Sequence, residues 1–229
     1  MENLITLYHG SEKTVEHPLY KYGKLHNDFG LGFYCTQSEE LAKEWAVTSF
    51  KDGFCNRYIL DTEYLKILNL NSNNYSVLNW IAILLEHRVF SVKNPVANRA
   101  KRYLLDHFGI NVNAYDVIIG YRADDSYFDY AEAFINNSIT LEQLAQALKL
   151  GKLGEQVVIK SEFAFSQLSF EGVTQVKSSE YYGRRKDRHD TAYIDYMNLL
   201  EKNDDGLYIQ DIIRGGITND DPRIPRNVH

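Results

Sequence analysis

Apolar residues form short β-prone runs near both ends of the chain and helix-like periodic stretches in its middle. Residues 4–8 predict a strand that stops at His9-Gly10-Ser11, where a loop begins. A second short strand is predicted to end the segment 28–36, since its two glycines let the backbone turn tightly. Thr36-Gln37-Ser38-Glu39 has the pattern of a capping box, with Thr36 as N-cap, and predicts that a helix opens here with Leu41, Ala42, Trp45 and Ala46 on one face.

The spacing of apolar residues predicts that the middle of the chain is predominantly helical. Helices are predicted at 77–90, at 96–108 with Asn94-Pro95 opening it, at 127–135, at 141–148 with Thr140 as N-cap, and at about 191–200. One or two strands are predicted within 57–70, and further strands at 115–120 and 156–160. The tail around Asp220-Asp221-Pro222 is predicted to be loose. Because the strands do not alternate regularly with the helices, we predict an α+β fold in a single domain, 1–229.

Composition restricts the possible ligands only partly. Seventeen Tyr, eleven Phe and two Trp suit flat-ring ligands, but they equally suit an ordinary core or an interface. A net charge of −6 gives no overall field for holding nucleic acid or an anionic membrane. Any polyanion must therefore be bound by a local patch of positive charge.

The cysteines, histidines and N-terminus point to a reduced, aqueous compartment. Cys35 and Cys55 show no CxxC spacing, and no pair of histidines has metal-ligand spacing with a nearby acidic partner, so we predict no metal site. The segment 1–13 lacks a basic start and a long apolar run, and no stretch reaches the roughly 18 apolar residues of a membrane span. We expect a soluble, cytoplasmic protein without a cleaved export signal or a membrane partner.

Two sequence motifs and one further aromatic residue, in the order and at the spacing of a known superfamily, carry a family resemblance. Leu7-Tyr8-His9-Gly10-Ser11 resembles the first motif of the ADP-ribosyltransferases related to poly(ADP-ribose) polymerases and diphtheria-type toxins. Gly30-Leu31-Gly32-Phe33-Tyr34 resembles their second motif, Gly-x-Gly-x-Tyr. Trp45 occupies the place where that superfamily has a second aromatic residue on a helix.

A narrower resemblance covers most of the chain. The segments at His9, Asp28-Phe29-Gly30, Ala123-Asp124-Asp125 and 156–170 are similar to a bacterial uncharacterised-domain family placed within this superfamily. The resemblance implies a core at about 1–170, a C-terminal extension at about 171–229, and a split antiparallel sheet that grips NAD in a cleft with helices outside. Asp124-Asp125 is explained equally well as a helix cap or as a functional pair.

The resemblance assigns roles to the motif residues. Tyr34 and Trp45 would stack on the nicotinamide ring of NAD, the co-substrate. Gly10 would let its backbone pair with the carboxamide, and Ser11 would add a hydroxyl contact. His9 would donate a hydrogen bond to a ribose hydroxyl and so position NAD.

The third motif raises a question of register. The superfamily normally places a carboxylate on a later strand, where it binds a ribose hydroxyl and stabilises the ribosyl cation. The matching strand here reads Gly154-Glu155-Gln156, and adjacent strand residues point to opposite faces, so only one of the last two enters the pocket. The resemblance selects Gln156, with Glu155 as the alternative. Because a neutral amide supplies neither negative charge nor a base, mono-transfer is favoured over chain elongation.

These observations predict a mono-ADP-ribosyltransferase that uses NAD and a macromolecular acceptor, either protein or nucleic acid. The resemblance associates such enzymes with bacterial toxins neutralised by an antitoxin or immunity protein, or with phage defence. An NAD glycohydrolase and a catalytically silent NAD or ADP-ribose sensor are the alternatives. The basic cluster 184–188, preceded by Tyr181 and Tyr182, is either a solvated helix surface or a site that contacts phosphates and bases.

Overall fold

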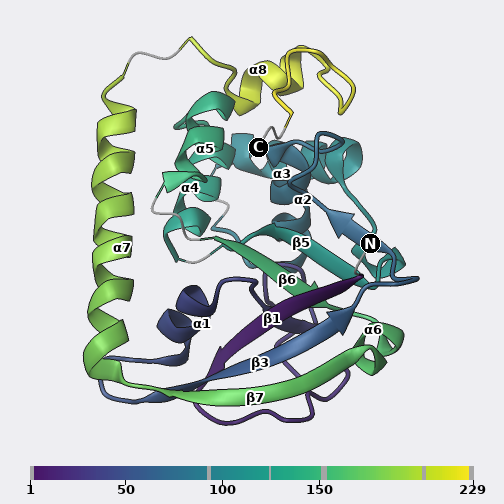
Figure 1. Ribbon diagram of the computed structural model, residues 1–229. Helices are drawn as coiled ribbons and strands as arrows, with labels where there is room; N and C mark the ends of the chain where they lie inside the picture. Colours follow the sequence, from purple (N-terminus) through teal and green to yellow (C-terminus); the bar gives the residue numbers. More distant parts are fainter. Residues whose placement is uncertain (1–2, 92–93, 124, 151–153, 203–204, 227–229) are drawn as a thin grey trace.

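A computed structural model describes residues 3–226, apart from 92–93, 124, 151–153 and 203–204, and has the predicted α+β architecture (Figure 1). One sheet is antiparallel, in the order β1 (Leu4–Ser11), β3 (Gly53–Asp61), β7 (Leu168–Val176). The other has the order β2 (Phe33–Cys35), β6 (Glu155–Ile159), β5 (Val117–Tyr121), β4 (Ile67–Asn69). Its pairings are antiparallel except for the parallel pair β4 and β5.

The helices lie around the two sheets (Figure 1). In chain order they are α1 (Glu39–Ala46), α2 (Val77–His87), α3 (Pro95–Phe108), α4 (Asp125–Ile135), α5 (Leu141–Ala147), α6 (Glu162–Ser166), α7 (Ser178–Leu200) and α8 (Ile209–Arg214). Helices α2 to α5 gather beside the four-stranded sheet, and α7 runs along one side of the molecule, contacting α1, α4 and α5. Within the part of the chain that the structure describes, no helix has the length and apolar character needed to cross a bilayer.

The two sheets meet at an antiparallel bridge between Tyr8 and Thr36. The Tyr8 N–H donates to the Thr36 carbonyl at 2.8 Å, and the Thr36 N–H donates back at 2.9 Å. Tyr8 lies within β1, and Thr36 directly follows β2. The bridge therefore brings His9, on one sheet, close to Tyr34, on the other.

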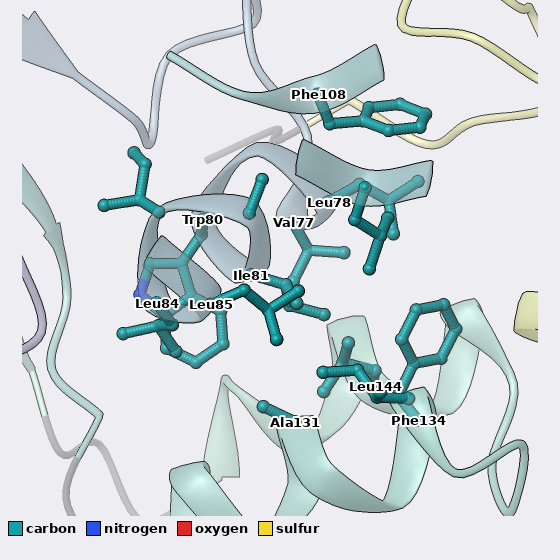
Figure 2. Close-up of a cluster of buried hydrophobic side chains, with 14 of the residues drawn as sticks. Val77, Leu78, Trp80, Ile81, Leu84, Leu85, Phe108, Ala131, Phe134 and Leu144 are labelled. Carbon is teal, nitrogen blue, oxygen red and sulfur yellow. The ribbon is translucent and has the colours of Figure 1, made fainter. Parts of the chain in front are cut away.

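The main core is built around α2, which is apolar on all sides. Every residue from Val77 to Leu85 is buried, as expected for a helix enclosed by other elements. Figure 2 shows α2 side chains facing Phe108 of α3, Phe134 of α4 and Leu144 of α5. At about 2 kcal/mol for each large apolar side chain buried, this cluster contributes much of the stabilisation of the fold.

The structure differs from the sequence predictions at the first motif. Strand β1 continues through His9, Gly10 and Ser11, which pair with Asn56, Cys55 and Phe54 of β3 rather than opening a loop. The neighbouring strand supplies partners beyond the apolar run, so the strand extends past it.

Helix α1 also begins later than predicted, because its N-cap is Ser38. The Ser38 hydroxyl accepts from the Leu41 N–H at 3.3 Å. Thr36, the predicted N-cap, is used instead in the bridge to Tyr8. By contrast, the predicted N-caps Asn94 of α3 and Thr140 of α5 are confirmed.

The C-terminal part is more ordered than its sequence suggested. Helix α7 begins at Ser178, well before the predicted helix at 191–200, so the basic cluster 184–188 is helical. The segment around Asp220-Asp221-Pro222, predicted to be loose, lies between Ile217 and Ile224, which are both buried in the main core. Tyr196 of α7 stacks on Tyr130 of α4 with ring centroids 3.9 Å apart. These isolated contacts have no local periodicity that a sequence pattern could reveal.

Two glycines allow α1 to pack closely against the three-stranded sheet. A Cβ atom at Gly10 would overlap the carbonyl oxygen of Ala42, and one at Gly53 would overlap that of Ala46. Both positions face the backbone of α1, which cannot move aside as a flexible side chain can. The close approach of helix and sheet is therefore possible only because residues 10 and 53 have no side chain.

We expect Gly10→Ala to lower the free energy of unfolding by about 3 kcal/mol, the upper end of overpacking costs. Gly183→Ala is the matched control, because Gly183 lies within α7 with open space around it and alanine is the better helix former by about 1 kcal/mol. Urea denaturation measures both changes. A Gly10→Ala variant as stable as the wild type would mean that α1 is free to shift away from β1.

Candidate functional site

A cavity of about 1260 Å³ lies where the two sheets meet, and it is the setting for all six predicted site residues. Its lining includes residues predicted from the motifs: His9, Gly10, Ser11, Tyr34, Trp45 and Gln156. They come from β1, β2, α1 and β6. The loop between β1 and β2 and helix α7 supply much of the remaining wall. The volume exceeds the roughly 300–1,000 Å³ typical of a site for one small molecule.

His9 is held by the neighbouring strand. Its Nδ1 atom lies 2.8 Å from the Tyr34 carbonyl oxygen, and its ring packs against Phe33 with centroids 4.5 Å apart. Because a carbonyl only accepts, Nδ1 carries a proton and donates it. Burial lowers the pKa of His9 below its ordinary value of 6.5, against the opposing effect of this hydrogen bond. The neutral ring therefore offers Nε2 as an acceptor, which reverses the donor role that the sequence suggested.

Tyr34 lines the cavity and packs against the main core, and its hydroxyl bonds to the preceding loop. The hydroxyl donates to the Gly30 carbonyl at 2.6 Å and accepts from the Phe29 N–H at 3.1 Å. Burial is the main cause that raises the pKa of Tyr34 above its ordinary value, so the phenol stays neutral. Tyr34 thus fixes the loop that carries Asp28.

Trp45 lines the same cavity from α1, with one ring face already covered. The guanidinium carbon of Arg122 lies 4.5 Å from the centroid of the Trp45 ring. This cation–π contact orients the indole.

Gly10 and Ser11 have structural partners that their motif did not predict. A side chain at position 10 would point at the backbone of α1, so close packing alone is a sufficient reason for a glycine here. The Ser11 hydroxyl donates to the Lys13 carbonyl at 2.5 Å and accepts from Asn56 Nδ2 at 3.1 Å. Asn56 is buried, and its Oδ1 accepts from the Val15 N–H at 2.8 Å. Asn56 thereby fastens the start of the cavity loop to β1.

Asp28 places a buried carboxylate, 5% exposed, in the wall of the cavity beside Gln156. Oδ1 accepts from Arg88 Nη1 at 2.7 Å, and Oδ2 accepts from the Ala123 N–H at 2.9 Å and from Gln156 Nε2 at 2.8 Å. Burial raises the pKa of Asp28 above its ordinary value, while the hydrogen bonds from Gln156 and Ala123 and the charge of Arg88 lower it. Accepting on both oxygens suits the ionised form.

Of the two candidates on β6, Gln156 lines the cavity and Glu155 does not. Glu155 accepts from Asn71 Nδ2 at 2.6 Å on the other face of the strand. The Gln156 Nε2 atom donates to Asp28 and, at 3.3 Å, to the Tyr121 carbonyl. Because two acceptors surround this nitrogen, the amide orientation is determined and Oε1 is left as the acceptor atom.

The loop that carries Asp28 is held from several directions. The Phe29 side chain is fully buried in the main core, and its carbonyl accepts from Lys160 Nζ at 2.6 Å. Gly30 has φ +73°, a left-handed conformation that glycine adopts without strain. The second motif therefore places Asp28 as well as Tyr34.

The cavity is electropositive although the chain as a whole is acidic, with a net charge of −6. Its lysines and arginines are Lys13, Lys24, Arg88, Arg122, Arg185, Lys186 and Arg188, and its acids are Asp28 and Glu44. Each acid pairs with an arginine at 2.7 Å, Asp28 with Arg88 and Glu44 with Arg188. An anionic ligand would therefore be favoured in this cavity.

Sequence reasoning missed the roles of Asp28, Arg88 and Arg122. They lie on loops or at a helix end, where burial leaves no periodic pattern, and their partners are far away along the chain. Asp124 lies outside the described residues, as does the side chain of Asp125, so the two explanations of that pair stay open. No cluster of three potential metal ligands occurs among the residues that the structure describes, and the thiols of Cys35 and Cys55 are free and buried.

The comparisons with known proteins identify a family without assigning a chemistry. A family model described as "Protein of unknown function (DUF3990)" matches residues 5–170. This region contains His9, Asp28, Tyr34 and Gln156 and ends before α7. No curated protein and no solved structure matches the chain.

We expect Gln156→Glu to destabilise the protein in a pH-dependent way, since it sets two carboxyl groups at the hydrogen-bonding distance now shared by Gln156 and Asp28. The like charges raise the pKa of the folded pair, which then holds a proton that the unfolded chain releases. Relative to the wild type, the free energy of unfolding therefore falls by about 1–3 kcal/mol as the pH rises from about 4 to about 8.

Gln156→Leu is the control, because it removes the same hydrogen bonds without adding a titrating group. Loss of the Gln156 donor raises the pKa of Asp28 alone, so the deficit of this variant changes less with pH than that of Gln156→Glu. The double variant Asp28→Asn with Gln156→Glu again pairs one amide donor with one carboxylate, with the two positions exchanged. We expect it to recover much of the free energy of unfolding that Gln156→Glu loses. Equal pH profiles for Gln156→Glu and Gln156→Leu would contradict the contact between residues 28 and 156.

Proposed function

We propose that this chain, which belongs to the DUF3990 family, is a mono-ADP-ribosyltransferase that cleaves NAD and transfers ADP-ribose to a macromolecular acceptor. The observation that carries the proposal is the convergence of His9, Tyr34 and Gln156, from three separate strands, on one electropositive cavity. The motif resemblance supports NAD as the ligand, and the positive lining suits its pyrophosphate.

The nicotinamide ring would lie against Tyr34 and Trp45. Tyr34 presents a neutral ring whose position is fixed by its two hydroxyl contacts. Arg122 occupies one face of Trp45, so the ligand would take the other face. Stacking between aromatic groups contributes about 0.5–1.5 kcal/mol beyond the burial of apolar area.

His9 and Gln156 would bind ribose hydroxyl groups as acceptors. His9 offers Nε2 because its Nδ1 proton is donated to Tyr34. Gln156 offers Oε1 because its Nε2 hydrogens are donated to the Asp28 carboxylate and the Tyr121 carbonyl. A hydroxyl group has one proton to donate, so two fixed acceptors suit two hydroxyls of the substrate.

In the reaction, the bond from the ribose C1′ to the nicotinamide nitrogen breaks, and its electron pair leaves with nicotinamide. The acceptor's nucleophile then forms a bond to C1′ and loses its proton to solvent. Hydrogen bonds accepted from the ribose hydroxyls stabilise the positive charge that develops on the sugar. Asp28 acts as a positioning residue here, because Arg88 neutralises its charge while it holds the Gln156 amide. The absence of a general base at residue 156 favours transfer of a single unit.

Incubation with labelled NAD tests the proposal. A transferase yields labelled macromolecules from a cell lysate, and digestion by protease or by nuclease identifies the class of acceptor. An NAD glycohydrolase yields free ADP-ribose instead. A silent sensor, which the neutral Gln156 makes a real alternative, yields neither product but binds NAD.

We expect Gln156→Ala to lower the rate of NAD cleavage by about one to three orders of magnitude, as for other removed electrostatic partners of a transition state. The affinity for NAD should change much less. Glu155→Gln is the control, since it keeps an acceptor for Asn71 outside the cavity and should leave the rate nearly unchanged. If Glu155→Gln abolished cleavage while Gln156→Ala had no effect, the assignment on β6 would be wrong.

We expect Tyr34→Ala to weaken NAD binding by about 1–2 kcal/mol, because it removes a stacking surface and its buried area. Tyr34→Phe keeps the ring but loses both hydroxyl contacts, so it should bind NAD more tightly than Tyr34→Ala while unfolding at a lower temperature than the wild type. Calorimetric titration gives the affinities. A folded Tyr34→Ala variant with wild-type affinity would place NAD elsewhere.

A further inference from the structure

Helix α7 forms one wall of the cavity, although it lies outside the region matched by the family model. Tyr182, Arg185, Lys186 and His189 all line the cavity. Residues spaced by three and four positions share one face of a helix, so these side chains form a continuous strip. The C-terminal extension therefore contributes directly to the site.

The basic residues of α7 divide into two groups. Arg184 and Arg188 hold the helix against α1, through ion pairs with Glu40 at 3.0 Å and Glu44 at 2.7 Å. Arg185, which is exposed, uses one N–H in a hydrogen bond to the Val47 carbonyl at 3.2 Å and has further N–H donors. Arg184 and Arg188 therefore anchor the helix, whereas Arg185 keeps N–H donors that could bind a ligand.

Three exposed lysines bring further positive charge to the cavity that Arg185 lines. Lys186 is exposed and forms no ion pair within the described part of the chain. Lys13 and Lys24, from the loop between β1 and β2, are also exposed and line the same cavity. Cationic side chains from two separate segments thus face one space, in which the acids Asp28 and Glu44 already have arginine partners.

We propose that Arg185 and Lys186 are a phosphate-binding wall of the cavity, with Tyr182 beside them as a surface on which a base can stack. A guanidinium binds phosphate oxygens through a planar fork, and an ammonium adds a point charge. The phosphate belongs either to the pyrophosphate of NAD or to the backbone of a nucleic-acid acceptor. This proposal extends the proposed function, because the cavity exceeds the usual volume for one small ligand and has room for part of a second reactant.

The double variant Arg185→Gln with Lys186→Gln tests the wall. The probes are ADP-ribose, a single-stranded oligonucleotide of about ten bases, and nicotinamide riboside, which has no phosphate. We expect a loss of affinity of tenfold or more for ADP-ribose or for the oligonucleotide, and no change for nicotinamide riboside. The probe that loses affinity identifies the source of the phosphate. For the oligonucleotide, the slope of log affinity against log salt concentration should also become shallower by about 1.4, since two cationic contacts are lost at roughly 0.7 each on a single strand.

Arg99→Gln with Arg102→Gln is the matched control, since it removes two exposed positive charges from α3, away from the cavity. It should leave all three affinities unchanged, and melting temperatures verify that both double variants are folded. The proposal is overturned if the α7 variant binds both phosphate probes like the wild type, if the control variant loses as much, or if the wild type binds neither probe at low salt. If phosphate binding depends on α7 but the protein cleaves no NAD, the proposed function is contradicted while the phosphate-binding role of Arg185 and Lys186 is upheld.

Discussion

The burial of the Asp28 carboxylate is the constraint on which the site depends. A charged group withdrawn from water must be paired and hydrogen-bonded, or it costs several kcal/mol. Asp28 meets this requirement with donors from the end of α2, from the segment after β5 and from β6, which are distant in sequence. Satisfying one carboxylate therefore fixes the position of the loop before β2, the orientation of the Gln156 amide and the direction of Arg88.

Local signals were sufficient for much of the fold. Asn94-Pro95 and Thr140 mark helix starts by chemistry confined to one turn, and the apolar run of α2 is long enough to be unambiguous. Strand β7 was not predicted because its alternation lasts only from Leu168 to Glu171 before Gly172 interrupts it, and α7 was predicted too short because most of its residues are polar. The motif residues His9, Tyr34 and Gln156 were found through resemblance. Asp28 could not be recognised as their link, since its importance lies in contacts across the fold.

Helix α7 depends on the family region as much as it contributes to it. Its Tyr196 stacks on Tyr130, and its Arg188 meets the buried Glu44 of α1. The segment after α7 returns to the main core through Ile212 and Ile224. The wall of the cavity is thus supported by apolar packing at one end of the helix and by ion pairs at the other, which is how an extension outside the matched region comes to hold a fixed position at the site.

The pairing of Asp28 with Gln156 has a consequence for how this protein can evolve. An acid at 156 would place a second carboxyl group against Asp28, and a neutral residue at 28 would remove the counter-charge of Arg88. Each single step away from the present pair passes through a less stable protein, which selection tends to remove before the second step occurs. We therefore expect residues 28 and 156 to change together among related chains, and a more acidic site would be reached most easily from an ancestor with stability to spare.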